Sequence, residues 1–147
     1  MKLHRAFGIV RGDVVSLIGA GGKTSTLVAL GYELAEMGWR VLATTTTRIG
    51  QNQLEFFPHT VTYHANAQSL STLLNEHRFV FLHDDIRSGK VYGPAPGWIP
   101  HLLDSTDSDV LLIEADGARG LPLKAPFSYE PVGAAGRSLG IPLPSMS

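Results

Sequence analysis

The chain has 147 residues and a formal net charge of −1, with 44% hydrophobic and 17% charged residues. This length suits one domain with a core of its own, and the near-neutral charge gives no basic excess for binding nucleic acid or a membrane surface. The absence of cysteine excludes disulfides, iron–sulfur clusters and thiolate zinc sites, and it favours a cytoplasmic location. No N-terminal signal peptide is expected, and no apolar run approaches the roughly 20 residues that a membrane helix needs.

The first half of the chain predicts a strand, a helix and a second strand. Residues 14–18 form an apolar run that is typical of a short buried strand. Residues 23–37 are expected to be helical, because their leucines recur at three- and four-residue steps and Gly38 suits the position after a helix. Gly31 interrupts this helix at a cost of roughly 1 kcal/mol relative to alanine. With a strand at residues 40–44, the result is a βαβ unit and a parallel pair of strands.

The second half predicts further alternation of strands and helices. Three more strands are expected, at residues 60–63, 79–82 and 110–113. A helix at residues 69–77, a loop rich in glycine and proline at 89–100 and a short helix at 101–104 connect them. The expected fold class is α/β, with a mostly parallel open sheet in a three-layer α/β/α arrangement like that of P-loop NTPases.

The end of the chain differs from the rest. Residues 133–147 are rich in glycine, proline and serine and are expected to be an unpatterned, disordered tail. Residues 1–132 are then a P-loop-like nucleotide-binding domain.

The stretch SLIGAGGKTST, residues 16–26, follows the first strand and admits three interpretations. A dinucleotide turn G-x-G-x-x-G fails, because Thr24 occupies the third glycine position. It fails again because threonines, rather than an acidic residue, follow the second strand. The full P-loop pattern also fails, because Leu17 stands where its first glycine belongs. A flexible loop is the third interpretation.

A shorter P-loop pattern, G-x-x-G-K-T, is met by Gly19, Gly22, Lys23 and Thr24, and this segment resembles the Mur ligase and folylpolyglutamate synthetase type of loop. Backbone N–H groups and the helix N-terminus would surround the phosphates of ATP or GTP. Lys23 would place a cation on the β- and γ-phosphates, and the Thr24 hydroxyl would hold Mg²⁺. The expected cradle comprises Gly19, Ala20, Gly21, Gly22, Lys23, Thr24 and Ser25.

A run of four threonines, Thr44, Thr45, Thr46 and Thr47, ends the second strand. Because ligands of open α/β sheets bind beyond the carboxyl ends of the strands, Thr45 and Thr46 are expected to contact phosphate, and Thr46 also Mg²⁺. The alternative is that threonine is simply a good strand former. For Arg48 two interpretations remain: its side chain neutralises phosphate charge, or it is an ordinary surface residue.

Two carboxylates, Glu114 and Asp116, follow the apolar strand at 110–113 in a Walker B-like layout. Two residues apart on an extended chain, they share one face. One is expected to hold Mg²⁺ and the other to position or deprotonate a nucleophile, so both are candidate catalytic residues together with Lys23. A polar turn after a core strand is the alternative. Arg119 and Lys124 are candidates for binding anionic substrate groups.

The segments GAGGKT, VLATTTTRI and LIEADGARGLPLKAP occur in this order and resemble those of the YqeC-type family of selenium-dependent hydroxylase accessory proteins, over about residues 14–132. The resemblance implies an NTP-binding protein in the maturation of selenium-dependent molybdenum hydroxylases, with a hydroxylase or a cofactor-loading protein as partner. It matches Glu114, Asp116, Gly117 and Lys124 to the acidic and PLKAP signatures. Because family members continue with further α/β structure, the chain is expected to be truncated and its sheet incomplete.

These observations leave three hypotheses for the role of the chain. The first is an Mg²⁺-dependent NTPase or NTP-driven transferase. The second is a non-catalytic nucleotide switch that contacts a partner, and the third is an inactive truncated remnant. No motif in the sequence selects the nucleotide or the second substrate.

Overall fold

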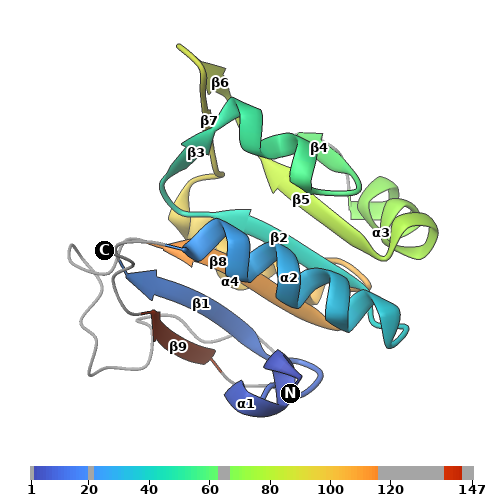
Figure 1. Ribbon diagram of the computed structural model, residues 1–147. Helices are drawn as coiled ribbons and strands as arrows, with labels where there is room; N and C mark the ends of the chain where they lie inside the picture. The colour runs from blue at the N-terminus through green and yellow to red at the C-terminus, as the bar shows by residue number, and fades with distance from the viewer. Residues whose placement is uncertain (1, 20–21, 63–66, 116–137, 144–147) are drawn as a thin grey trace.

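The computed structural model describes residues 2–19, 22–62, 67–115 and 138–143. These residues form a six-stranded sheet with helices on both faces, which confirms the predicted three-layer α/β/α fold (Figure 1). The strands of this main sheet are β1 (Val14–Gly19), β2 (Val41–Thr45), β4 (Thr60–Thr62), β5 (Phe79–His83), β8 (Val110–Ala115) and β9 (Ser138–Leu143).

The strands of the main sheet follow the order β4-β5-β2-β8-β1-β9, and all of its pairs are parallel. The expectation that β1 and β2 pair directly is wrong, because β8 lies between them and pairs with both. β8 is apolar up to Ile113 and buried along its whole length. A strand buried on both faces belongs at the centre of a parallel sheet, and β8 takes that place.

The helices cover the two faces of the sheet according to the direction in which each connection runs. α2 (Lys23–Glu36) joins β1 to β2 and covers one face, where its leucines pack on β1, β2 and β8. α3 (Ala67–His77) and α4 (Ile99–Ser105) cover the other face. Their connections run along the sheet in the opposite direction, so right-handed crossovers place them on the opposite side.

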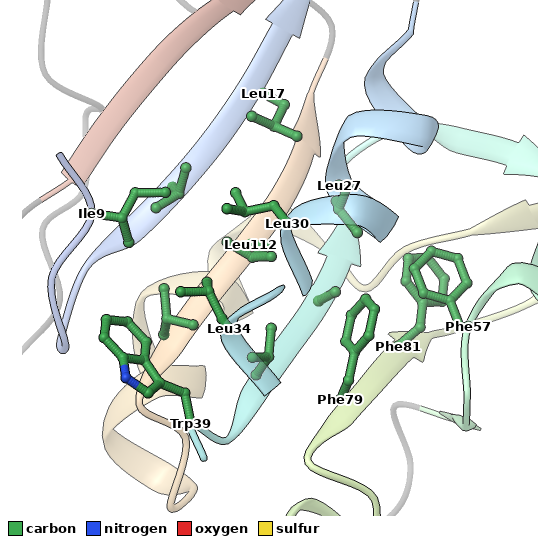
Figure 2. Packing of buried hydrophobic residues seen from close by; sticks show 14 of the residues in the cluster. Ile9, Leu17, Leu27, Leu30, Leu34, Trp39, Phe57, Phe79, Phe81 and Leu112 are labelled. Atoms are coloured by element: carbon green, nitrogen blue, oxygen red, sulfur yellow. The ribbon is translucent and has the colours of Figure 1, made fainter. Parts of the chain in front are cut away.

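Gly31 lies where α2 passes over the aromatic side chain of Phe79 in β5. Figure 2 shows Phe79 beside α2, with Phe57 and Phe81 on the side of Phe79 that is away from the helix. A Cβ built on Gly31 would lie 2.2 Å from Cζ of Phe79. The glycine that weakens the helix locally is therefore needed for the close approach of α2 to β5.

Several short elements were not expected from the sequence. α1 (Leu3–Phe7) precedes β1, and its backbone N–H groups at Leu3 and His4 donate to the Glu33 carboxylate of α2 at 2.9 and 2.7 Å. A second, antiparallel sheet contains β3 (Arg48–Gly50), β7 (Lys90–Tyr92) and β6 (Ile86–Arg87), in this order. The 3₁₀ helices are η1 (Gln51–Phe56) and η2 (Pro96–Trp98). The loop expected at 89–100 thus contains β7 and η2, whose few residues are too short to show a periodic pattern.

β9 lies within the segment expected to be an unpatterned tail, and it corrects that expectation at its six residues. It pairs in parallel with β1 from Val14↔Ser138 to Gly19↔Leu143. Leu139, Ile141 and Leu143 alternate along the strand and pack against the core beneath α2. Gly140 and Pro142 obscure this alternation in the sequence, and proline is tolerated because β9 lies at the edge of the sheet that the described strands form. The expected domain boundary at residue 132 lies outside the described residues.

His59 and His77 connect the start of β4 to the end of α3. Their rings stack with centroids 4.2 Å apart and an interplanar angle of 9°. Burial and the nearby His77 lower the pKa of His59 below its ordinary 6.5, against an opposing effect of Glu76. The folded protein therefore favours the neutral form of His59.

Gly31→Ala is expected to lower the free energy of unfolding by about 1–2 kcal/mol, because overpacking against Phe79 outweighs the gain in helix propensity. Urea denaturation followed by tryptophan fluorescence measures the change. The matched control is Gly97→Ala, where an added Cβ meets no atom within 4 Å. A Gly31→Ala variant as stable as the wild type would contradict the close approach.

His59→Asn is expected to flatten the dependence of stability on pH. Because the pKa of His59 is lowered in the folded state, its contribution is complete above about pH 6.5 and is lost as the pH falls through the lowered value. The wild type should therefore lose more unfolding free energy than His59→Asn between about pH 7 and pH 5. His101→Asn, at an exposed position of α4, is the control. Identical pH profiles for the wild type and His59→Asn would refute this.

Candidate functional site

The glycine-rich turn between β1 and α2 requires glycine at two described positions. Gly22 is the residue that caps the N-terminus of α2, with φ +73°, and Gly19 has φ +142°. Side chains other than glycine rarely adopt these angles. A Cβ on Gly19 would also lie 2.5 Å from the carbonyl oxygen of Leu143 in β9. The predicted cradle residues Ala20 and Gly21 lie outside the described residues.

The first turn of α2 is bonded to the end of β8. The Thr24 hydroxyl donates to Oε2 of Glu114 at 2.7 Å, and Nζ of Lys23 donates to the carbonyl oxygen of Ala115 at 3.1 Å. Thr24 is 8% exposed and Glu114 is 7% exposed. Residues that are 90 positions apart in the sequence, and that were predicted independently as phosphate and metal ligands, therefore form one buried cluster.

The register of the sheet places Glu114 at this point. β1 and β8 pair with Leu17 opposite Glu114 and Ile18 opposite Ala115. Side chains alternate along a strand, so Glu114 shares the α2 face with Leu112, whereas Ala115 faces the side of α4. The carboxylate consequently emerges directly under the start of α2.

The threonine run divides between the two faces of the sheet. Thr45 lies opposite Glu114, and its hydroxyl donates to the Glu114 carbonyl oxygen at 3.1 Å. The same oxygen accepts the backbone N–H of Thr46 at 3.0 Å, and the Thr45 hydroxyl accepts the N–H of Thr47 at 3.1 Å. The Thr44 hydroxyl donates to the Leu82 carbonyl at 2.8 Å. Thr44 and Thr45 are fully buried, so their hydroxyls hold strands together, while Thr46 is half-buried.

The remaining predicted site residues are either exposed or outside the described part of the chain. Ser25 is exposed in the first turn of α2, and Arg48 is exposed at the start of β3. Asp116, Gly117, Arg119 and Lys124 lie outside the described residues, so the structure does not place the second carboxylate or the PLKAP segment.

Two further residues at this edge of the sheet, His83 and Gly93, were not among the predicted site residues. His83, at the end of β5, is 6% exposed, with Nδ1 3.1 Å from the carbonyl oxygen of Asp84. A Cβ on Gly93 would lie 1.6 Å from the carbonyl oxygen of Thr45, so only glycine lets the chain after β7 pass over β2. Burial of His83 follows from the unbroken apolar run before it, but no local pattern marks Gly93.

The polar groups at the start of α2 are of the kinds that bind an oxyanion and a hard cation such as Mg²⁺. A hydroxyl, a carboxylate and an ammonium group meet at the N-terminus of α2, where the helix dipole favours negative charge. Within the described part of the chain, no group of three or more histidines and carboxylates could hold a metal by itself. A magnesium ion fits one hydroxyl and one carboxylate, because Mg²⁺ takes few protein ligands and fills its sphere with water and phosphate oxygens.

Thr24→Val is expected to lower the free energy of unfolding by about 1–3 kcal/mol, because the buried Glu114 carboxylate loses a hydrogen-bond donor. Chemical denaturation at neutral pH measures the loss. Thr26→Val, the same exchange two residues further along α2, points to another side of the helix and should change stability much less. Equal effects of the two substitutions would count against the buried bond.

Comparison with known proteins gives the family of the chain. The model of the family described as "YqeC protein" matches residues 15–146, past the point where the resemblance in the sequence was expected to end. The "Uncharacterized protein YqeC" of Escherichia coli (strain K12) is 41% identical over 126 residues. These residues cover 82% of this chain, which spans only 47% of that relative. No solved structure matches. Among the described residues, no helix is long and apolar enough to cross a bilayer. The chain belongs to the YqeC family.

Proposed function

We propose that the chain binds an Mg²⁺–nucleoside triphosphate, ATP or GTP, at the carboxyl end of β1 and uses it as an NTPase or NTP-driven transferase. The observation that carries this proposal is the 2.7 Å hydrogen bond between Thr24 and Glu114, beside the Lys23 ammonium. A lysine, a hydroxyl and a carboxylate at the start of a helix, behind a glycine turn, are the groups that a triphosphate and its metal need.

Each described group has a separate task in this proposal. The turn at Gly22 and the first N–H groups of α2 bind phosphate oxygens, because the dipole of the helix favours negative charge at its N-terminus. Lys23 stabilises negative charge that develops on the transferred phosphoryl group. Thr24 and Glu114 hold Mg²⁺, with Thr46 at the same edge of the sheet. The bound ion supplies charge neutralisation on the phosphate oxygens.

The remaining roles rest on the sequence. Asp116 positions or deprotonates the nucleophile, and Lys124 binds an anionic group of the nucleotide or of the second substrate. Ser25, exposed beside Thr24, adds a hydroxyl to the phosphate site. Glu114 is buried against Thr24, which suits a metal ligand better than a base and leaves the proton-transfer role to Asp116.

The cellular role proposed for this site is the maturation of selenium-dependent molybdenum hydroxylases in the cytoplasm. Support for this role comes only from the family resemblance. The partner would be a hydroxylase or a protein that loads its cofactor. The chain contains no cysteine, so none of its own side chains supplies a soft thiolate ligand for molybdenum.

A non-catalytic nucleotide switch is the second candidate, and the bonds of Glu114 favour it. Its carboxylate accepts from Thr24 of α2, while its carbonyl oxygen accepts from Thr45 and from the N–H of Thr46. A ligand that pulls on the carboxylate would therefore act on the segment joining β2 to β3. Turnover of labelled nucleotide, with and without a partner, separates a switch from an enzyme.

Lys23→Ala is expected to weaken binding of Mg-ATP or Mg-GTP at least about ten-fold, because charged hydrogen bonds to phosphate are each worth roughly 1.5–3 kcal/mol. Isothermal titration calorimetry with both nucleotides measures the affinities and identifies the preferred base. Lys2→Ala is the control, because Lys2 lies next to α1, which is bonded to the far end of α2 at Glu33.

Unchanged nucleotide binding in a Lys23→Ala variant that melts cooperatively would refute the phosphate site. A wild-type chain that melts cooperatively and binds neither nucleotide would also refute it. A non-cooperative melt of the wild type would instead support the inactive remnant.

A further inference from the structure

We propose that the outer face of the small antiparallel sheet is a docking surface for an acidic segment of a partner protein. The surface, called here the basic face, consists of Arg48 in β3, Arg87 in β6, and Lys90 and Tyr92 in β7. Figure 1 shows β3, β7 and β6 side by side, projecting from the main sheet. This inference does not require the proposed nucleotide site.

The strand register brings the four side chains to one face. Arg48 lies directly opposite Tyr92, and Arg87 lies directly opposite Lys90. Residues opposite one another in an antiparallel pair share a face, and so do Lys90 and Tyr92, two positions apart. The Arg87 guanidinium lies 4.1 Å from the centroid of the Tyr92 ring, which independently places both on the same side.

The opposite face of the small sheet anchors it to the protein. Ile49 is 4% exposed and Val91 is fully buried, and both belong to the core beneath α2. The chain on either side is also fixed, because the N–H of Asp84 donates to the Tyr92 carbonyl at 2.7 Å. β3 and β7 are therefore anchored to the core, whereas Ile86 of β6, which lies opposite Val91 on this inner face, is 39% exposed.

The charge of the basic face is opposite to that of the whole chain. It has three cations in a chain of net charge −1. One carboxylate, Asp85, lies 3.0 Å from Nε of Arg87 and offsets part of that charge. Arg48 and Lys90 are exposed. Cations gathered on one small face produce a local positive potential, which attracts and orients an acidic partner.

The side chains favour a protein partner over a small anion. Small-molecule sites are concave, whereas the Arg87 side chain is 63% exposed and stands out from a sheet. Arginine and tyrosine are, with tryptophan, enriched among the residues that contribute most of the binding energy in protein interfaces. The diagonal spacing across an antiparallel pair is about 7–8 Å. It is close to the roughly 7 Å between alternate side chains of an extended segment, so carboxylates at every second residue could meet the cations.

The basic face also adjoins the candidate site. Arg48 follows Thr47 directly, and Gly93, which packs against the Thr45 carbonyl, follows Tyr92. The Arg48–Tyr92 end of the face therefore lies close to Thr45 and Glu114, and the Arg87–Lys90 end lies further from them. A partner seated on the face would reach the rim of the site.

The test uses a fluorescein-labelled 12-residue peptide of alternating glutamate and serine, with its binding followed by anisotropy at low salt. The wild type is expected to bind it saturably, and Arg87→Gln/Lys90→Gln to bind it about ten-fold more weakly. Lys2→Gln/Arg5→Gln removes the same charge at and just before α1, and its affinity for the peptide should stay within about two-fold of the wild type. A matching lysine–serine peptide should bind to Arg87→Glu/Lys90→Glu and not to the wild type.

Equal weakening by both double variants would show that only net charge matters and would overturn the proposal. So would failure of the peptide to bind, or tighter binding of single-stranded RNA that is lost in the same variant. Association of the chain with itself, removed by Arg87→Gln/Lys90→Gln in sedimentation, would identify a second copy as the occupant instead. Mg-ATP titrations of these variants report separately on the nucleotide site, because Arg87 and Lys90 have no part in it.

Discussion

The hydrogen bond between Thr24 and Glu114 is the contact around which the candidate site is organised. It exists only because β8 inserts between β1 and β2, so that a carboxylate near the end of the central strand faces the start of the helix that follows β1. The carbonyl oxygen of the same Glu114 holds Thr45 and Thr46. One residue thereby links the glycine turn, the acidic strand and the segment that leads to the basic face.

Close backbone approach is the second constraint, and glycines satisfy it. Gly31 lets α2 lie against Phe79, and Gly93 lets the chain after β7 pass over the Thr45 carbonyl. Gly22 supplies the left-handed turn that starts α2. A side chain at Gly31 or Gly93 would displace a neighbouring element, and one at Gly22 would strain the turn, so the geometry of the site depends on these glycines as well as on its polar residues.

Periodicity and apolar runs were enough to predict the three-layer fold, because β1, β5 and β8 are buried strands and the α2 leucines share one face. Strand order could not be read in this way, since the position of β8 depends on long-range pairing. The small antiparallel sheet was not predicted because strands of two or three residues are too short to show a periodic pattern. β9 was not predicted because a glycine and a proline interrupt the alternation of Leu139, Ile141 and Leu143. Motif spacing predicted Lys23, Thr24 and Glu114 as site residues, whereas the contact between Thr24 and Glu114 depends on the strand register.

The most direct test of the account is the Mg²⁺ dependence of ATP affinity in Thr24→Val, Glu114→Gln and the double variant, measured by calorimetry with and without the ion. If the two oxygens hold one ion together, each single substitution removes most of the Mg²⁺-dependent part of the affinity, and the double variant is little worse than either. Losses that add in the double variant, or an Mg²⁺ dependence that survives both substitutions, would contradict the shared site.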